Sequence, residues 1–339
     1  MGSLPTDVQS DAVPPDLAPV KVALLGQRMW TLHLARLMQR HASELVEPWA
    51  ATERQAAGIL ARPRARKPSI LLRVGYRPGA PTVRGRTFDA LWRLLRASAG
   101  DALPIHYWIG SDVLNTLRDA SLGHLTRAFD AARRETHFAG APWLAEELAT
   151  VGIDAEFVIF PGEMPTSAPP PLPDQFTVLS YVPDARFAFF GGDEILAAAG
   201  AMPEVQFLIM GGHGPASGAP PNVAFLGWRQ DTADLYARSS VVLRLVPHDN
   251  IGLTAREGLA YGRHVVYTQP LPNTIRIRTG SSADLIAVLR ELYGRHVDGR
   301  LELNDVGLTY VRREFDERAT TRHLAERLVA AVSSSDRLA

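Results

Sequence analysis

The chain has 339 residues, enough for two domains of about 150 residues each. Its composition is that of a globular protein, with 46% hydrophobic and 21% charged residues, and its formal net charge of zero gives no global argument for a nucleic-acid or membrane partner. The absence of cysteine excludes disulfides, thiolate metal ligands and a cysteine nucleophile. No segment approaches the roughly 18 to 20 apolar residues of a membrane-spanning helix.

The first half of the chain predicts alternating strands and helices. Residues 1–20 lack the basic-then-apolar order of a signal peptide and are expected to be a disordered leader. Apolar runs at residues 21–26, 69–76 and 104–110 predict buried strands, and helical patterns separate them. Strands that alternate with helices predict a mostly parallel, doubly wound sheet over residues 21–165.

A proline-rich segment separates this region from a second alternating set. Residues 161–175 contain six prolines, and we expect a linker at 166–175 because proline resists both helix and sheet. Residues 176–314 predict a second Rossmann-like domain, and residues 315–339 predict an amphipathic helix that packs back on the first. The expected fold is α/β, with two doubly wound lobes and a ligand in a cleft at the carboxyl ends of their strands.

Loops that follow predicted strands in the second lobe carry the chemical signals. The most informative is PHDNIGLTAREGLAYG, in which Asp249 precedes a loop and Glu257 lies about one turn into a predicted helix. Free backbone N–H groups at the start of such a helix suit a diphosphate. The two carboxylates are expected to point into one cleft and to bind hydroxyl pairs. A nucleotide that carries a sugar fits this arrangement. The other loops present Arg186, the turn Gly211, Gly212 and His213, and the pair Gly227 and Trp228.

These residues resemble the nucleotide-sugar-binding half of GT-B retaining glycosyltransferases of family 4 (glycosyltransferase group 1). The family carries a Glu, seven residues and a second Glu, and this chain has Asp249, seven residues and Glu257. The resemblance implies that Glu257 holds the nucleotide ribose and that Asp249 holds donor-sugar hydroxyls. It also implies that a backbone segment meets the sugar and the diphosphate: Asn250, Ile251, Gly252, Leu253 and Thr254. Aspartate is one methylene shorter than glutamate, which leaves the identity of the sugar open.

Further landmarks follow in the order found in the family, and the resemblance is strong over about residues 175–270. The phrase FLIMGGHGP, with Gly211, Gly212 and His213, resembles the strand and turn before the base pocket, and Gly227 and Trp228 follow the next strand. Arg186 falls where the family uses a basic residue to neutralise the donor phosphates. Arginine in place of lysine is consistent with a chain that has 34 arginines and two lysines.

The first lobe resembles the family more weakly. In HYWIGSDV, Gly110 and Asp112 match a His-Gly-x-Asp-like segment, Ile109 takes the place of its histidine, and His106 lies three residues earlier. The resemblance implies His106, Asp112, Arg186 and Asp249 as catalytic candidates. Packing of His106 and Trp108 in a strand is the alternative. No protein nucleophile is needed, because the leaving diphosphate can itself help to deprotonate the acceptor hydroxyl.

The expected function is therefore transfer of a sugar, with retention, from a UDP-, GDP- or TDP-sugar to a glycan, lipid-linked or small-molecule acceptor, in bacterial surface-glycan biosynthesis. A nucleotide-sugar epimerase or hydrolase and a non-catalytic sugar-nucleotide-binding subunit are the alternatives. A dinucleotide oxidoreductase is disfavoured, because no Gly-x-Gly-x-x-Gly turn has a suitable acid after it. With no DxD-type motif, we expect neither a metal nor a cofactor other than the donor. The expected location is the cytoplasm.

Residues 61–86 hold eight basic residues and no acid. One expectation is that they contact anionic lipid on the inner face of the membrane or a lipid-pyrophosphate acceptor, since each charge near such a surface adds about 1 kcal/mol of binding free energy. The alternative is that they form a solvated loop in an arginine-rich chain. The segment lacks the interleaved aromatic residues of a stacking platform, and no zinc-finger or helix-turn-helix spacing is present, so no nucleic-acid partner is expected.

Overall fold

The computed structural model describes residues 18–51 and 67–336. Contacts divide the chain into a first unit, Met1–Gly162 with Glu317–Ala339, and a second unit, Glu163–Asp316. Within the described residues each unit has a six-stranded sheet in which all neighbouring strands are parallel. Almost all of the predicted leader, residues 1–17, lies outside the described part of the chain.

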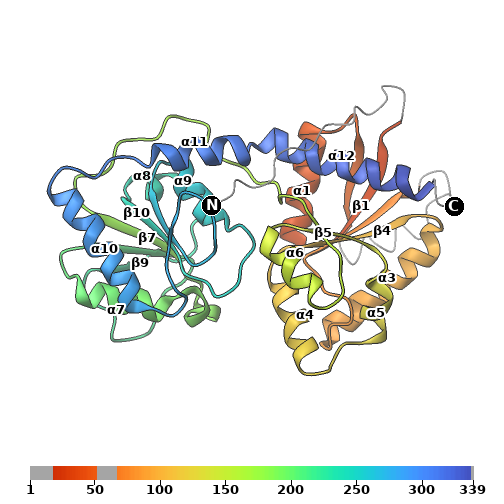
Figure 1. The fold of residues 1–339 in the computed structure, drawn as a ribbon, viewed down its shortest axis with the longest axis horizontal. Helices are drawn as coiled ribbons and strands as arrows, with labels where there is room; N and C mark the ends of the chain where they lie inside the picture. Colours follow the sequence, from red (N-terminus) through yellow and green to blue (C-terminus); the bar gives the residue numbers. More distant parts are fainter. Residues whose placement is uncertain (1–17, 52–66, 337–339) are drawn as a thin grey trace. The chain divides into compact units, whose positions relative to one another are not determined.

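The sheet of the first unit has the order β2-β1-β3-β4-β5-β6, with helices on both faces (Figure 1). Its strands are β1 (Val20–Gly26), β2 (Val46–Ala51), β3 (Ile70–Val74), β4 (Leu103–Trp108), β5 (Thr136–Ala139) and β6 (Glu156–Phe157). Its helices are α1 (Arg28–His41), α3 (Val83–Ala99), α4 (Ser111–Ser121), α5 (Arg127–Ala132), α6 (Pro142–Ala149) and α12 (Glu317–Asp336).

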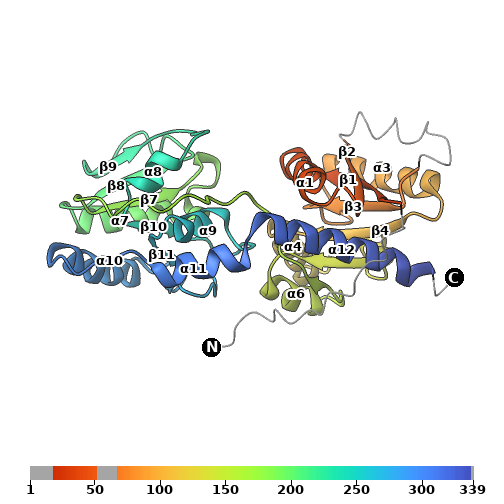
Figure 2. The same cartoon turned by 90° about the horizontal axis from the view of Figure 1, so that it is seen from above.

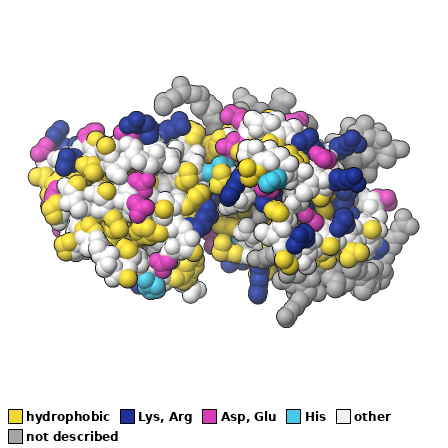
Figure 3. All heavy atoms as spheres, turned by 90° about the horizontal axis from the view of Figure 1, so that it is seen from below, with side chains coloured by type: hydrophobic (Ala, Val, Ile, Leu, Met, Phe, Trp, Pro, Cys, Tyr) yellow, Lys and Arg dark blue, Asp and Glu magenta, His cyan; other side chains and the backbone are white. Residues whose placement is uncertain are grey.

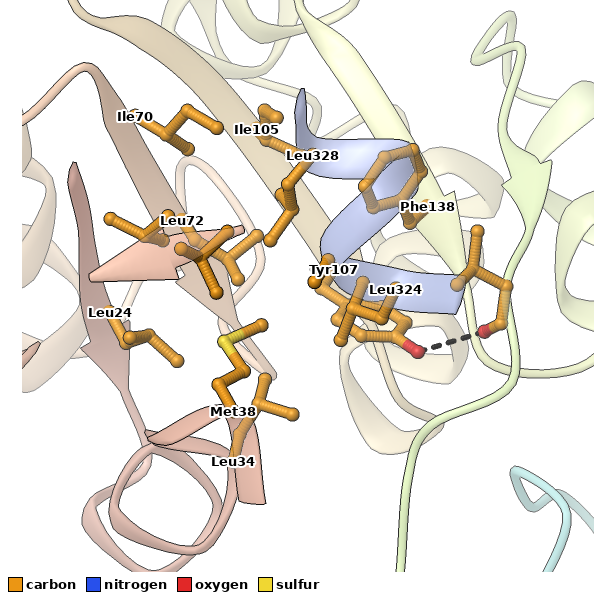
Figure 4. Packing of buried hydrophobic residues seen from close by; sticks show 14 of the residues in the cluster. Leu24, Leu34, Met38, Ile70, Leu72, Ile105, Tyr107, Phe138, Leu324 and Leu328 are labelled. Atoms are coloured by element: carbon orange, nitrogen blue, oxygen red, sulfur yellow. Dashed lines mark hydrogen bonds between the residues drawn. The ribbon is translucent and has the colours of Figure 1, made fainter. Parts of the chain in front are cut away.

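Alternating side chains of the strands build two hydrophobic cores. In β1, Val22 and Leu24 pack against α1 and α12, whereas Ala23 and Leu25 pack against α3. This is the period of two expected of a strand that is buried on both faces. In the first core, shown in Figure 4, the buried Tyr107 hydroxyl donates to the Val158 carbonyl at 2.8 Å.

The last helix belongs to the first unit. Leu324 and Leu328 are fully buried in the core that α1 lines with Leu34 and Met38, and α12 lies beside α1 in the views of Figures 1 and 2. At its start, Glu317 accepts from Arg40 at 3.0 Å and contacts His41 at 2.6 Å. The C-terminal segment therefore completes the hydrophobic core of a domain whose other residues lie more than 150 positions earlier.

The sheet of the second unit has the order β12-β11-β10-β7-β8-β9. Its strands are β7 (Thr177–Tyr181), β8 (Gln206–Met210), β9 (Val223–Phe225), β10 (Val241–Arg244), β11 (His264–Tyr267) and β12 (Ile275–Arg276). Its helices are η2 (Asp184–Arg186), η3 (Ala188–Phe190), α7 (Gly192–Ala201), α8 (Ala233–Ala237), α9 (Leu253–Ala260), α10 (Ser282–Val297) and α11 (Asp305–Glu314). The order of the strands reverses between β7 and β10.

The proline-rich segment is attached to this second unit. Residues 166–175 form no helix or strand, and the fully buried Arg263 donates to the carbonyls of Pro170 and Pro171 at 3.0 and 3.2 Å. Arg263 also donates to the Tyr236 carbonyl at 3.0 Å. With no acid among these partners, burial lowers the pKa of Arg263 to about 10.

Some elements were not predicted from the sequence. The edge strand β2 contains Pro48 and Trp49 in VEPWAA, which does not alternate, and proline is tolerated there because an edge strand needs fewer backbone donors. The helices α4, α5 and α11 were also missed. Two of them begin with a side-chain cap, in which Thr126 accepts from the Phe129 amide and Asn304 accepts from the Gly307 amide.

The packing of α12 gives a stability prediction. Truncation of the fully buried Leu328 in Leu328→Ala should lower the free energy of unfolding by about 2 to 5 kcal/mol, because it leaves a cavity. Urea unfolding followed by tryptophan fluorescence is suited to the test, since five of the six tryptophans lie in the first unit. Ser334→Ala, at an exposed position of the same helix, is the control. Equal stability of the two variants would show that α12 does not contribute to this core.

Candidate functional site

The candidate site lies at the carboxyl ends of the strands of the second unit. Doubly wound sheets bind ligands where the strand order reverses, and here β10 and β7 are the neighbours at that point. The loops after β7 and β10 carry Arg186 and Asp249, and the loops after β8 and β9 carry the glycine turn and Trp228. The parallel sheet thus brings the predicted donor-site loops to one edge.

The start of α9 presents free backbone donors. Gly252 is the N-cap residue, and its carbonyl accepts from the amides of Ala255 and Arg256 at 3.1 Å. The amides of Leu253 and Thr254 donate to no acceptor in the described part of the chain. Because the helix dipole adds partial positive charge at this end, the start of α9 favours an anion such as phosphate.

Arg186 supplies a cation to the same edge of the sheet. Its guanidinium carbon lies 3.8 Å from the ring centroid of Phe189 and 5.4 Å from that of Phe190. Within residues 18–51 and 67–336 no carboxylate pairs with this exposed side chain. Partial burial and the nearby charge of Arg244 lower its pKa. An unpaired cation next to a second cation is an arrangement that an anionic ligand would stabilise.

Asp249 does not present a free carboxylate. Its Oδ2 accepts from Arg244 Nε at 2.7 Å and its Oδ1 from Arg244 Nη2 at 2.9 Å. The Tyr267 hydroxyl accepts from the Gly252 amide at 3.2 Å, and its single proton is shared between Asp249 Oδ2 at 3.0 Å and the Asn250 carbonyl at 2.9 Å. The structure therefore places Asp249 in a network that fixes Arg244 and the N-cap of α9.

Glu257 contacts a different group. The Tyr236 hydroxyl donates to its Oε2 at 2.5 Å, and the ring of Tyr236 stacks on that of Tyr261, with centroids 5.1 Å apart. Burial raises the pKa of Glu257, although the hydrogen bond from Tyr236 and the charge of Arg256 oppose the shift. Only Tyr236 donates to this carboxylate among the described residues, so Oε1 is available to a ligand.

The glycine turn after β8 is held by Asp184, whose carboxylate accepts from the amides of His213 at 2.8 Å and Gly214 at 2.9 Å. Gly212 is required here, because a Cβ at this position would lie 2.4 Å from Asp184 Oδ1. The turn is also joined to the loop after β9, since the Gly211 amide donates to the Gly227 carbonyl at 2.7 Å.

Trp228 follows directly in that loop. The side chain is 71% exposed, and its ring centroid lies 6.4 Å from that of Tyr181. A large aromatic side chain that is exposed next to a backbone turn can contact a flat ligand such as a nucleobase.

The predicted residues of the first unit are buried. His106 lies in β4 with 2% exposure, its Nε2 donates to the Glu135 carboxylate, and its ring stacks on His137 with centroids 4.9 Å apart. Burial, aided by Arg73, lowers the pKa of His106 well below its usual range. The imidazole is therefore neutral, and its buried Nδ1 has no hydrogen-bond partner among the residues that the structure describes. In this geometry His106 does not reach solvent.

Asp112 organises the segment before α4. Its carboxylate accepts from the Ile109 amide at 3.1 and 3.2 Å and from the Val113 amide at 3.1 Å. Burial raises its pKa to about 6. Ile109 lies against Gly75, where a Cβ would be 2.8 Å from the isoleucine Cδ1. His106 and Asp112 thus have separate protein partners, Glu135 for one and backbone amides for the other.

Sequence reasoning missed the partners of the predicted residues: Arg244, Tyr267, Tyr236, Asp184 and Glu135. Only Arg244 carries a clear signal, since VVLRLV places a charged residue in an otherwise apolar strand, and a buried charge requires a partner. The tyrosines look like ordinary packing residues in the sequence.

Within the described part of the basic segment 61–86, the basic side chains differ in exposure. Residues 61–66 lie outside the described residues. Arg73 is buried, with a bond of 2.8 Å to Asp89 Oδ1, and Arg77 pairs with Asp119. Arg86 is exposed, and other Lys and Arg side chains lie on the face of the first unit drawn in Figure 3. Arg73 therefore contributes no surface charge, which corrects the prediction for that residue.

The described residues contain neither a cluster of metal ligands nor a helix suited to span a membrane. No three His, Asp or Glu side chains there are grouped so that they could hold a metal ion. No helix in the same ranges is long and apolar enough to cross a bilayer.

No protein-family model and no curated protein matches the chain. Its fold matches solved structures. HepE from Anabaena in complex with UDP-glucose is 14% identical, with 91% of this chain and 99% of HepE covered and a TM-score of 0.63. Sucrose-phosphate synthase from Thermosynechococcus elongatus is 12% identical, with coverage of 93% and 100% and a TM-score of 0.65. A glycosyltransferase from Rickettsia africae is 11% identical, with coverage of 93% and 98% and a TM-score of 0.63.

These comparisons confirm the predicted fold class, which is α/β with two Rossmann-like units of the GT-B type. At identities of 14% or less, the likeness concerns the fold. The activity must be argued from the residues of the site.

The buried Asp112 gives a prediction about pH. The pKa of Asp112 is about 6 in the folded protein, whereas that of an unfolded aspartate is about 4. The protonated carboxyl therefore stabilises the fold fully below pH about 4, and this contribution to the free energy of unfolding is lost as the pH rises to about 6. Wild type should therefore lose about 3 kcal/mol relative to Asp112→Asn between those pH values. Urea unfolding at a series of pH values measures the difference. The exposed Asp130→Asn should follow wild type, and a constant difference for Asp112→Asn would contradict the assignment.

Proposed function

We propose that the protein is a glycosyltransferase whose second unit binds a nucleoside-diphosphate sugar. The observation that carries the proposal is the pair of free amides at the start of α9 beside the unpaired Arg186, at the point where the strand order reverses. Solved structures of similar fold support it, since HepE is in complex with UDP-glucose in one and with UDP and glucose in another.

Each part of the donor has a counterpart in the site. The diphosphate would lie at the amides of Leu253 and Thr254 and at Arg186, and Glu257 would accept hydrogen bonds from the ribose hydroxyls through its free Oε1. The base would lie at the loops after β8 and β9, at Gly211, Gly212, His213, Gly227 and Trp228. Asn250, Ile251 and Gly252 would border the sugar.

The proposed reaction proceeds with retention and without a protein nucleophile. The bond between the anomeric carbon and the diphosphate oxygen breaks, and an acceptor oxygen forms a bond to the same face of that carbon. The acceptor proton moves to an oxygen of the departing diphosphate. Arg186 and the α9 amides stabilise the negative charge that develops on that group. We propose transfer without a metal ion, because these groups supply positive charge at the diphosphate.

The acceptor is proposed to be a glycan, a lipid-linked saccharide or a small molecule in cytoplasmic synthesis of bacterial surface glycans. Asp112 would shape the segment 109–112 on the acceptor side through its bonds to backbone amides. Peripheral contact with the membrane would depend on the exposed basic residues of the first unit, such as Arg86.

A sugar-nucleotide-binding subunit without catalysis is the second candidate. Two observations favour it, namely the engagement of Asp249 by Arg244 and the burial of His106. Product analysis separates the candidates: transfer to an acceptor supports the first, donor binding without turnover supports the second, and free epimerised or hydrolysed sugar would indicate an epimerase or hydrolase.

Donor binding gives the next prediction. In calorimetric titrations with UDP, GDP and TDP, wild type should bind at least one nucleotide, and Glu257→Gln should bind it about 10- to 100-fold more weakly, because hydrogen bonds to a charged group are lost. The exposed Glu291→Gln in α10 is the control and should bind as wild type does. If wild type binds none of the three nucleotides, the proposed function is ruled out.

The raised pKa of Glu257 predicts a pH dependence of this affinity. The ionised carboxylate is the form that accepts two hydroxyl hydrogen bonds, and burial makes that form harder to reach. As the pH falls, the affinity for the nucleotide should therefore begin to decline at a pH above the one at which an ordinary glutamate titrates. Glu257→Gln should lack this component, and parallel pH profiles for the two proteins would contradict the role given to Glu257.

A further inference from the structure

Strand β10 ends in Arg244, whose guanidinium turns to the loop before α9. Two hydrogen bonds, Nε to Asp249 Oδ2 at 2.7 Å and Nη2 to Oδ1 at 2.9 Å, join the two side chains, which are 13% and 14% exposed. This paired geometry fixes the plane of the guanidinium and its direction. Burial pulls the pKa of Arg244 down, but Asp249 outweighs it and the net direction is up, so the side chain stays charged.

The bonding capacity of Asp249 is largely used. A carboxylate has about four lone-pair positions. Arg244 occupies two of them, and the Tyr267 hydroxyl, which can donate its single proton here or to the Asn250 carbonyl at 2.9 Å, lies 3.0 Å from Oδ2. Little of the carboxylate remains to accept from the hydroxyl groups of a sugar. Its connection through Tyr267 to the Gly252 amide ties it instead to the N-cap of α9.

Arg244 retains donors that no protein group uses. A guanidinium has five N–H groups, and in the described chain Nη1 makes no hydrogen bond. The guanidinium carbon lies 4.8 Å from the ring centroid of Phe190, and that of Arg186 lies 5.4 Å from the same centroid. Two cations thus gather at one ring, and among the described residues the carboxylate that pairs with them is Asp249, on Arg244. This leaves an excess positive charge that a bound anion would neutralise.

We infer that Arg244 is a second arginine that contacts the donor at its sugar-linked phosphate, and that Asp249 is a positioning residue that acts through Arg244. The inference rests on the proposed function, because it names residues of the same site. It replaces the expected contact between Asp249 and the sugar hydroxyls. Arg186 and Arg244 would hold the diphosphate from the β7 and β10 sides of the switch point, together with the α9 amides.

The test compares binding of UDP and UMP to the full-length protein by calorimetry. Arg244→Gln should weaken UDP binding at least tenfold and leave UMP binding within about twofold of wild type, since only UDP has the second phosphate. Unchanged UMP binding also shows that the second unit is folded. The exposed Arg290→Gln in α10 should bind both ligands as wild type does. If Arg244→Gln loses UMP binding as well, Arg244→Lys is measured in the same way. This variant should weaken binding of UDP more than binding of UMP.

Asp249→Asn separates positioning from sugar contact. A positioning role predicts equal weakening of UDP and UDP-glucose, and no further loss when the substitution is added to Arg244→Gln. If Asp249→Asn weakens binding of UDP-glucose but not of UDP, Asp249 contacts the sugar and the inference is overturned. The inference is also overturned if Arg244→Gln or Arg244→Lys keeps the wild-type preference for UDP over UMP. Failure of wild type to bind any nucleotide would instead overturn the proposed function.

Discussion

The parallel order of β10, β7 and β8 is the constraint on which the candidate site depends. Neighbouring parallel strands end at the same edge, so loops from residues far apart in sequence meet there. The reversal of strand order between β7 and β10 leaves room between the loops that follow them. The fold therefore brings together Arg186 from one loop and the start of α9 from the other, independently of the contacts that their side chains make.

Positive charge is the property that these loops share. The free amides of α9 and the guanidiniums of Arg186 and Arg244 are concentrated at one edge, and Asp249 balances only one of the cations. Gathering like charges raises the free energy of the unliganded state, and the pKa of Arg186 is lowered by partial burial first and by the charge of Arg244 second. Binding of an anion would relieve that cost, and this is the physical reason for proposing that a diphosphate binds here.

In the first unit, the partly buried Asp89 and the buried Asp112 fix loops by accepting hydrogen bonds. Asp89 accepts from Arg73 and from the Gly79 amide, and Asp112 accepts from amides before α4. Both hold loops that follow parallel strands, β3 and β4. In the segment HYWIGSDV, side chains thus fix the backbone. We propose that backbone groups of this fixed segment contact the acceptor.

The sequence was sufficient for much of the fold and less of the site. Alternation of apolar strands with helices, and turns such as Gly211 and Gly212, predicted the architecture because these patterns are local. The edge strand β2 was missed because VEPWAA has no regular period. Arg244 stands out in its apolar strand, but its pairing with Asp249 could not be assigned, because which donor a carboxylate accepts from depends on side-chain directions that only the packed loops determine. The same holds for His106, whose burial depends on α3 and β5.

The most direct test of the account is a crystal structure of the protein with UDP. The diphosphate is expected at the start of α9, within hydrogen-bond distance of the Leu253 or Thr254 amide and of Arg186, with the ribose at Glu257. A nucleotide bound elsewhere, for example at the reversal point between β1 and β3 of the first unit, would contradict it.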